Sequence, residues 1–274
     1  MNREAIEKRL SVRTYVNKPL TEEERTIVGK ILDVAQKIQT PFGSVIQFFT
    51  DHQDTLGDDE AKRIGTYGFI KNAPSFIGGV VKNTKEGIID YGYVFEQIIL
   101  MLTEKEFGTC WLAGTFQRQA FKDHVLEDEI IPAISPIGYP TDQPSFKERM
   151  VRFAIKANRR KPFQEMFFDH DFDHPISNNH PYRDVLELVQ LGPSASNKQP
   201  WRILIEDQSI HLYLERTPGY ATAFPFVMQG LDMGIAMQHL DIGLHEKKID
   251  FERCIMKHPE KNGYEYIITY RLLK

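Results

Sequence analysis

The amino-acid sequence predicts an α+β protein that is built from two related halves. Each half contains, in the same order, a helix, a proline-containing turn, a strand and a long helix that is apolar on nearly every side. The long helices are expected at 91–107 and 226–244, and a helix that is apolar all round belongs in a core. Segment 46–51 (IQFFTD) parallels 202–207 (RILIED), and 106–108 (EFG) parallels 241–243 (DIG). The first pair is 156 positions apart and the second 135, so the pattern implies an old duplication with insertions or deletions.

Length and composition are those of a globular protein with one large or two small domains. The chain has 274 residues, of which 41% are hydrophobic and 26% are charged, enough to bury a sizeable core. A net charge of −4 offers no basic field for nucleic acid. The cysteines Cys110 and Cys254 are too few for a disulfide framework, and no apolar run is long enough for a signal peptide or a bilayer span. We therefore expect a cytoplasmic protein without nucleic-acid or membrane partners.

The first half is expected to begin with a short helix at 2–10. Thr21 and Glu24 have capping-box spacing, which predicts a helix that runs to about Lys37. Gly108 is a natural C-cap for the helix at 91–107. Strands are expected at 45–50, 75–81 and 134–140.

The second half follows a polar connection at 141–181 that contains four prolines. A helix at 182–191, a hairpin of strands at 202–206 and 210–215, the helix at 226–244 and a final strand at 264–272 are expected. Acidic and histidine side chains at 169–180 could suggest a metal site. They do not fall on one face of a helix or strand, so a solvated loop is the preferred interpretation.

Arg9, Ser11 and Arg13 alternate along the chain near its start. In an extended segment their side chains share one face, where two guanidiniums and a hydroxyl could clamp an anion, most naturally a phosphate. The alternative is a solvated basic edge.

The stretch 192–201 (GPSASNKQPW) lies between the expected helix at 182–191 and the next strand. Pro193 and Pro200 fix φ at its two ends, so its hydroxyl and amide groups have little freedom to lose. Such a turn suits the edge of a planar polar heterocycle, although a plain helix-to-strand turn is the alternative. The first half has the basic face and the second half this turn, which suggests one site assembled from both halves.

These motifs together resemble the nitroreductase family of flavoproteins. Arg9 with SVRTY resembles the Arg-x-Ser-x-Arg opening of that family, and PSASNKQPW resembles its Pro-Ser-x-x-Asn-x-Gln-Pro-Trp turn. The stretches FGTCWLAG and PIGYP resemble its later flavin-edge and strand segments. The resemblance implies a nitroreductase-like α/β/α sandwich. Because family members are usually homodimers with FMN at the interface, it also implies a fused pseudo-dimer with halves 1–160 and 161–274, which folds as a monomer, with a homodimer as the alternative.

The resemblance also assigns residues to FMN. It places the phosphate and ribityl chain on Arg9, Ser11 and Arg13, with Arg159 or Arg160 adding positive charge. It places the flavin ring against the turn and against backbone N–H groups of a segment in which Ala113 replaces a common acidic residue. The ring contacts expected on these grounds are Pro193, Ser194, Ala195, Ser196, Asn197, Gln199, Leu112, Ala113 and Gly114.

The implied activity is that of an FMN-dependent oxidoreductase. NADH or NADPH would give a hydride to flavin N5, and the electrons would pass in a ping-pong cycle to a nitroaromatic, quinone or related small acceptor. No side chain need act as acid or base, so no catalytic residue is named, and Cys110 is interpreted as packing. The alternatives are another reaction on the same scaffold, such as dehalogenation, dehydrogenation or flavin breakdown, and a non-enzymatic FMN-binding protein.

Overall fold

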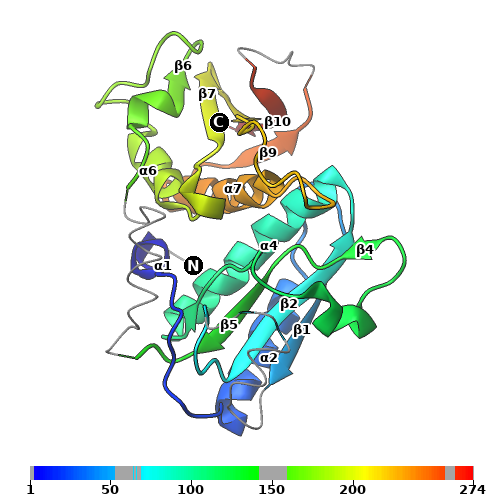
Figure 1. Ribbon diagram of the computed structural model, residues 1–274. Coiled ribbons are helices and arrows are strands. Elements are labelled where there is room, and N and C mark those ends of the chain that lie inside the picture. Colours follow the sequence, from blue (N-terminus) through cyan, green and yellow to red (C-terminus); the bar gives the residue numbers. More distant parts are fainter. Residues whose placement is uncertain are drawn as a thin grey trace.

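The computed structural model describes residues 3–52, 64, 66, 69–141, 159–256 and 263–273. Most of the acidic segment 51–60 (DHQDTLGDDE), for which a loop is expected, therefore lies outside the described residues. The first half forms a five-stranded sheet with helices packed on it (Figure 1). Its elements are α1 (Arg3–Lys8), α2 (Glu22–Ala35), β1 (Gln47–His52), β2 (Ser75–Lys82), α4 (Lys85–Glu104), β3 (Gly108–Thr109), the 3-10 helix η1 (Arg118–His124), β4 (Glu129–Ile130) and β5 (Ile134–Gly138).

The second half forms another five-stranded sheet. Its elements are η2 (Phe163–Glu165), β6 (Phe167–Asp169), α6 (Arg183–Leu191), η3 (Ala195–Asn197), β7 (Trp201–Glu206), β8 (Ser209–Leu214), α7 (Gln229–Glu246), β9 (Phe251–Cys254) and β10 (Glu265–Leu272). The short strands β6 and β9 were not expected from the sequence. β6 has three residues in a proline-rich segment and forms only because it pairs in parallel with β7.

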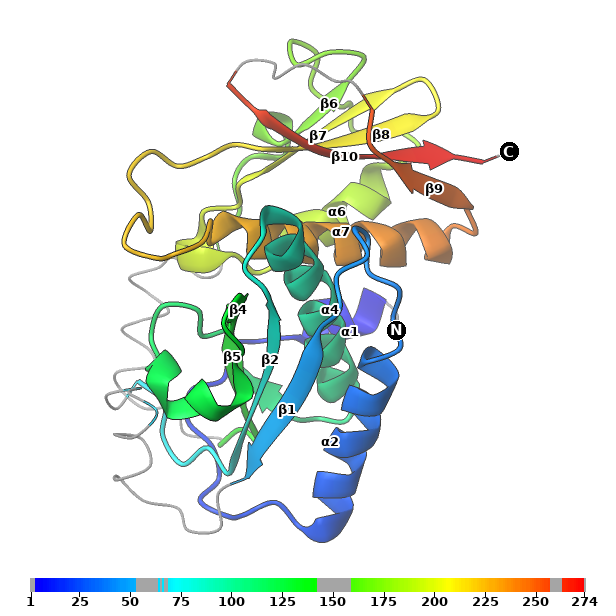
Figure 2. The same ribbon diagram turned by 90° about the vertical axis from the view of Figure 1, so that its right-hand side faces the viewer.

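The two sheets share one strand order. The first runs β1-β2-β5-β3 and the second β7-β8-β10-β9, with every neighbouring pair antiparallel. Two strands are added to this common plan, β4 beside β2 and β6 beside β7. Figure 2 shows the sheets on the outside, with the long helices α4 and α7 meeting between them. The protein is therefore an α+β protein of two related halves packed as an intramolecular pseudo-dimer.

The contact between α4 and α7 is reciprocal. A Cβ on Gly92 of α4 would collide with the carbonyl of Leu231, and a Cβ on Gly234 of α7 would collide with the carbonyl of Ile89. Gly92 and Gly234 are 142 positions apart, and so are Ile89 and Leu231. In a two-fold contact the same residues meet from both sides, so this crossing has the pattern of an isologous dimer interface. Two glycines let the helix backbones approach closely at that point.

The ends of these helices correct the register inferred from the sequence. α4 ends at Glu104 and α7 at Glu246, and the left-handed residues that follow are Glu106 (φ 64°) and Lys248 (φ 56°), again 142 positions apart. The interval of 135 and the expected cap at Gly108 are wrong, because Gly108 already lies in β3. Gly243, the residue that the sequence comparison paired with Gly108, lies inside α7, where its lack of a side chain lets α6 pack closely.

Other local patterns gave correct predictions. Thr21 caps α2 in a capping box with Glu24, as expected. Hydrophobic residues from both sheets, α4 and α7 form one continuous core, so the halves share their interior. A membrane-spanning helix needs about 20 consecutive, mostly apolar residues, and the described residues contain no such helix.

Candidate functional site between the halves

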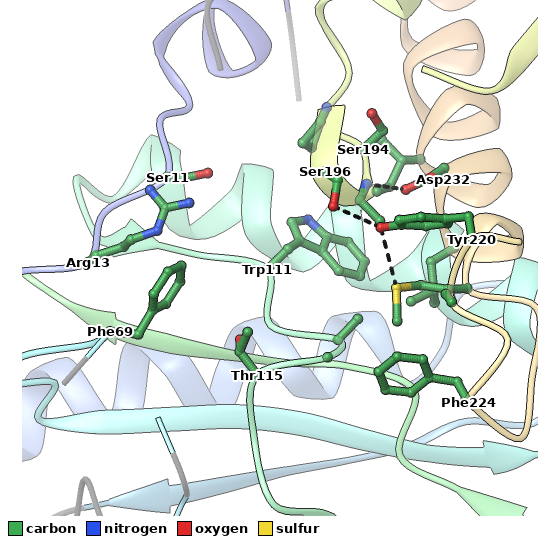
Figure 3. A pocket seen from close by; sticks show the side chains of 18 residues that line it. Ser11, Arg13, Phe69, Trp111, Thr115, Ser194, Ser196, Tyr220, Phe224 and Asp232 are labelled. Carbon is green, nitrogen blue, oxygen red and sulfur yellow. Dashed lines mark hydrogen bonds between the residues drawn. The ribbon is translucent and has the colours of Figure 1, made fainter. Parts of the chain in front are cut away.

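A cavity of about 460 Å³ lies where the two halves meet. Figure 3 shows Ser11 and Arg13 on one side, Tyr220, Phe224 and Asp232 on the other, and Trp111 between them. Each half of the chain therefore contributes one wall of the cavity. The lining residues are Ser11, Arg13, Phe69, Trp111, Ala113, Gly114, Thr115, Pro193, Ser194, Ala195, Ser196, Tyr220, Ala221, Phe224, Met228, Leu231, Asp232 and Ile235.

The first wall carries the guanidinium of Arg13, which lies in an extended segment that is hydrogen-bonded on both sides of it. The N–H of Val12 donates to the carbonyl of Thr109 (2.8 Å), and the N–H of Tyr15 donates to the carbonyl of Lys71 (3.0 Å). Alternation along this segment turns Ser11 and Arg13 to the same side. The guanidinium of Arg13 lies 5.1 Å from the centre of the Phe69 ring, and only 5% of Arg13 is exposed.

Arg9 and Arg160 lie next to each other, away from the cavity lining. The Nε of Arg9 is 4.0 Å from the Oε1 of Glu96, and Arg160 donates to the carbonyl of Leu191 (3.1 Å). Burial lowers the pKa of Arg160, and the positive charge of Arg9 lowers it further. The two guanidiniums are therefore close enough to repel each other, with the Glu96 carboxylate beside Arg9.

The turn that forms the second wall has an unusual backbone. Ser196, Asn197 and Gln199 have φ of 50°, 54° and 46°, in the left-handed region that residues with a side chain rarely adopt. Strain of this kind persists where surrounding bonds fix it, and it clusters at functional sites. Here the N–H of Gln199 donates to the Oγ of Ser194 (2.9 Å), and the N–H of Ala195 donates to Asp232 Oδ1 (2.9 Å).

Asn197 and Gln199 tie this turn to the connection between the halves. The Nδ2 of Asn197 donates to the carbonyl of Arg159 (2.8 Å), and the Oε1 of Gln199 accepts from the N–H of Lys161 (2.8 Å). Their amide groups are therefore used to hold the protein backbone, and they do not line the cavity.

Eight of the fourteen residues expected to bind the cofactor line the cavity. The other six are Arg9, Leu112, Arg159, Arg160, Asn197 and Gln199, and for five of these a cofactor contact stays a prediction. For Leu112, the N–H donates to the carbonyl of Ile134 (2.9 Å), so it is not available as the donor expected near the flavin. Of the three residues expected at 112–114, Ala113 and Gly114 line the cavity.

The aromatic residues of the walls and one carboxyl group were not expected from the sequence. The hydroxyl of Tyr220 donates to the Oγ of Ser196 (3.0 Å), and the indole of Trp111 donates to Glu96 Oε2 (2.8 Å), so both rings are fixed. Burial raises the pKa of Asp232 to about 8, against the opposing hydrogen bond from the Ala195 N–H. An acidic residue among the apolar residues of the first turns of this helix was the signal that could have pointed to Asp232.

The matching positions of the opposite half are filled. An interval of 142 pairs Trp111 with Arg253 and Ile235 with Tyr93. Arg253 forms an ion pair with buried Asp241, and the hydroxyl of Tyr93 donates to Asp241 Oδ2 (2.6 Å). This cluster occupies the place that corresponds to part of the cavity.

In the described part of the connection the histidines lie beside aspartates, and Asp169 is approached by both His170 (3.7 Å) and His180. His174 Nδ1 lies 2.6 Å from Asp171 Oδ1, and His180 Nε2 lies 3.9 Å from Asp169 Oδ1. Within the part of the chain that the structure describes, no three His, Cys, Asp or Glu residues gather as a metal site would require.

Comparison with known proteins gives a family. Residues 2–244 match the family described as "Putative TM nitroreductase", whereas no curated protein matches. A Thermotoga maritima crystal structure described as a "putative nitroreductase" has a TM-score of 0.64 at 22% identity, covering 99% of this chain and 93% of its own. A Clostridium difficile nitroreductase family protein (21% identity, TM-score 0.44) covers 60% of this chain and 96% of its own. An FMN-dependent nitroreductase of C. difficile (19% identity, TM-score 0.40) covers 52% and 88%. The family match extends over nearly the whole chain, and the protein therefore belongs to the nitroreductase family of oxidoreductases.

Proposed function

We propose that this protein is an FMN-dependent NAD(P)H oxidoreductase of the nitroreductase type. NADH or NADPH would be the electron donor, and a nitroaromatic, quinone or related small molecule the acceptor. The observation that carries the proposal is one cavity that joins Ser11 and Arg13 of the first half to the turn at 193–196 of the second. Family membership and a similar solved protein that is described as FMN-dependent support it.

The residues present fit FMN. Arg13 and Ser11 offer a charged donor and a hydroxyl for a phosphate at one wall, with Arg9 and Arg160 adding positive charge nearby. The remaining lining is mostly apolar and aromatic, as suits a heterocyclic ring, and the volume lies within the usual range for small-molecule sites, about 300–1,000 Å³. A bound FMN would supply hydride transfer between a reduced nicotinamide and a second substrate.

The protein would bind, orient and shield this group. Trp111, anchored through Glu96, and Phe224 exclude water from the walls. The strained turn at 193–199 is already fixed by its own hydrogen bonds, so little order has to be gained on binding. Arg13 places positive charge near the N-terminal wall, which favours a phosphate.

We further propose that the halves, 1–160 and 161–274, arose by duplication and that the chain works as a monomer with one flavin site. The shared strand order and the reciprocal glycine contact support the duplication. The cluster of Tyr93, Asp241 and Arg253 supports a single site, because it fills the matching positions.

The experiment is spectroscopy of the purified protein with added FMN. We expect flavin absorption at one FMN per chain, elution as a monomer on a sizing column, and bleaching by NADH or NADPH without oxygen. Arg13→Ala should weaken FMN binding by about 1–3 kcal/mol, as loss of a charged hydrogen bond does, whereas Arg271→Ala, at an exposed position of β10, should not. A protein that binds no FMN contradicts the proposal. A protein that binds FMN but is not bleached is a flavin-binding protein without this activity.

A further inference from the structure

Asp232 and Asp90 occupy matching positions in the two halves. Each lies two residues before the glycine at which its helix crosses the other, in Asp232-Met-Gly234 of α7 and Asp90-Tyr-Gly92 of α4, and the interval is again 142. Both carboxyl groups are buried, and both accept hydrogen bonds from the proline-containing turn of their own half. The two groups can therefore be compared directly.

The comparison shows one difference. Asp90 uses both oxygens, since Oδ1 accepts from the N–H of Phe42 (2.9 Å) and Oδ2 from the N–H of Ser44 (2.9 Å). Asp232 uses only Oδ1, which accepts from the N–H of Ala195. Among the described residues none forms a hydrogen bond to Asp232 Oδ2, although Asp232 is only 2% exposed. A buried polar atom without a partner is costly unless a ligand or water satisfies it.

The position of Asp232 indicates which group can form a hydrogen bond with Oδ2. Asp232 lines the cavity on the side opposite Arg13, beside Tyr220 (Figure 3). These three are the titratable side chains of the cavity lining. The α4 residues that approach this part of α7 are Ile88, Ile89, Gly92 and the backbone of Tyr93, and the Tyr93 hydroxyl donates to Asp241 instead. No cation among the described residues supports a charge on the carboxyl, and burial disfavours one.

We propose that Asp232 is a neutral carboxylic acid whose Oδ2–H donates a hydrogen bond to a carbonyl oxygen or ring nitrogen of the heterocycle bound in the cavity. The inference rests on the proposed function, in which that heterocycle is the flavin ring of FMN. Oδ1 keeps its bond from Ala195, so the acid proton belongs on Oδ2. In the other half, both oxygens of Asp90 accept hydrogen bonds from backbone N–H groups, so this matching carboxyl has only a structural role.

The pKa supports the same assignment, because a pKa of about 8 leaves Asp232 protonated at neutral pH. Ionisation would replace the donor by a negative charge that faces ligand acceptors. Burial raises the pKa of Tyr220 above its ordinary value near 10, so its hydroxyl stays neutral over the range in which Asp232 titrates.

The test is the affinity of FMN between about pH 6.5 and 9.5, followed by quenching of flavin fluorescence. For the natural protein the dissociation constant should be level up to about pH 8 and then rise, by up to about tenfold per pH unit. Asp232→Asn keeps an acceptor for Ala195 and a donor on Nδ2 but cannot ionise, so its affinity should not show this rise. Any ionisation of FMN itself affects both proteins equally and cancels in the comparison.

A second measurement does not depend on binding. The infrared spectrum of the FMN-free protein should contain the C=O stretch of a neutral buried carboxyl that Asp232→Asn lacks, and FMN should shift this band. An affinity without the rise above about pH 8, or the same rise in Asp232→Asn, overturns the inference while leaving the proposed function intact. A protein that binds no FMN removes the proposed function, and the infrared band then still decides whether Asp232 is neutral.

Discussion

Replacing Asp232 by asparagine should change how the stability of the FMN-free protein depends on pH. The Asp232 carboxyl has a pKa of about 8 when folded and about 3.9 in an unfolded chain, so between these values only the folded protein holds the proton. Because the pKa of Asp232 is raised in the folded state, its proton stabilises the folded protein at low pH, and this stabilisation is lost as the pH rises towards 8. The amide that Asp232→Asn introduces cannot titrate, yet its oxygen can still accept the hydrogen bond from Ala195.

The magnitude follows from the linkage between protonation and folding. Each pH unit between the two pKa values shifts the difference in unfolding free energy by about 1.4 kcal/mol in favour of the variant. From about pH 5 to pH 7 the shift is about 3 kcal/mol, large against a typical total stability of about 5–15 kcal/mol. Above about pH 8.5 the difference should become constant.

The assay is urea unfolding of both proteins at a series of pH values, with Asp250→Asn as the control for removing an exposed carboxylate. Subtracting the natural protein from the variant cancels the titration of every other group. If the two stability curves run parallel from about pH 5 to pH 8, Asp232 is not held neutral by burial, and the reasoning is refuted.

Three further outcomes are expected. Gly234→Ala should destabilise the protein by about 1–3 kcal/mol or more, because the added Cβ meets the backbone of α4. Gly29→Ala, which adds a Cβ in open space on α2, should stabilise it by up to about 1 kcal/mol. Similar effects of the two substitutions in urea unfolding would contradict the close crossing of α4 and α7. Arg253→Met should cost about 3–5 kcal/mol at neutral pH, because buried Asp241 loses its cation and keeps only neutral donors such as the Tyr93 hydroxyl. The loss should be smaller at low pH, where Asp241 takes up a proton, and a loss that does not vary with pH would argue against the buried ion pair. FMN extracted from the saturated protein should approach one per chain, and two per chain would show that the matching positions of the other half also form a site.

Local patterns in the sequence were enough to identify the main elements and both walls of the site. The capping box at Thr21, the apolar helices and the hairpin at 201–214 depend on neighbouring residues, whose spacing the sequence displays directly. The alternation of Ser11 and Arg13 and the turn at 193–196 likewise indicated which groups could share a ligand.

What the sequence could not determine depends on contacts between distant residues. β6 exists only beside β7, and the interval of 142 became visible only where Gly92 and Gly234 meet. The bond from the Asn197 amide to the backbone of Arg159 likewise joins residues that are far apart in the sequence.

Short runs of residues are enough to predict the fold class, the family and the two segments that face each other across the cavity. That buried Asp232 lines this cavity with one oxygen unbonded, and that Arg253 and Tyr93 fill the matching positions, follows only from the folded chain. Burial and hydrogen-bond satisfaction arise from packing, and no short segment contains them. The same carboxyl is costly, neutral or paired according to what the fold brings beside it.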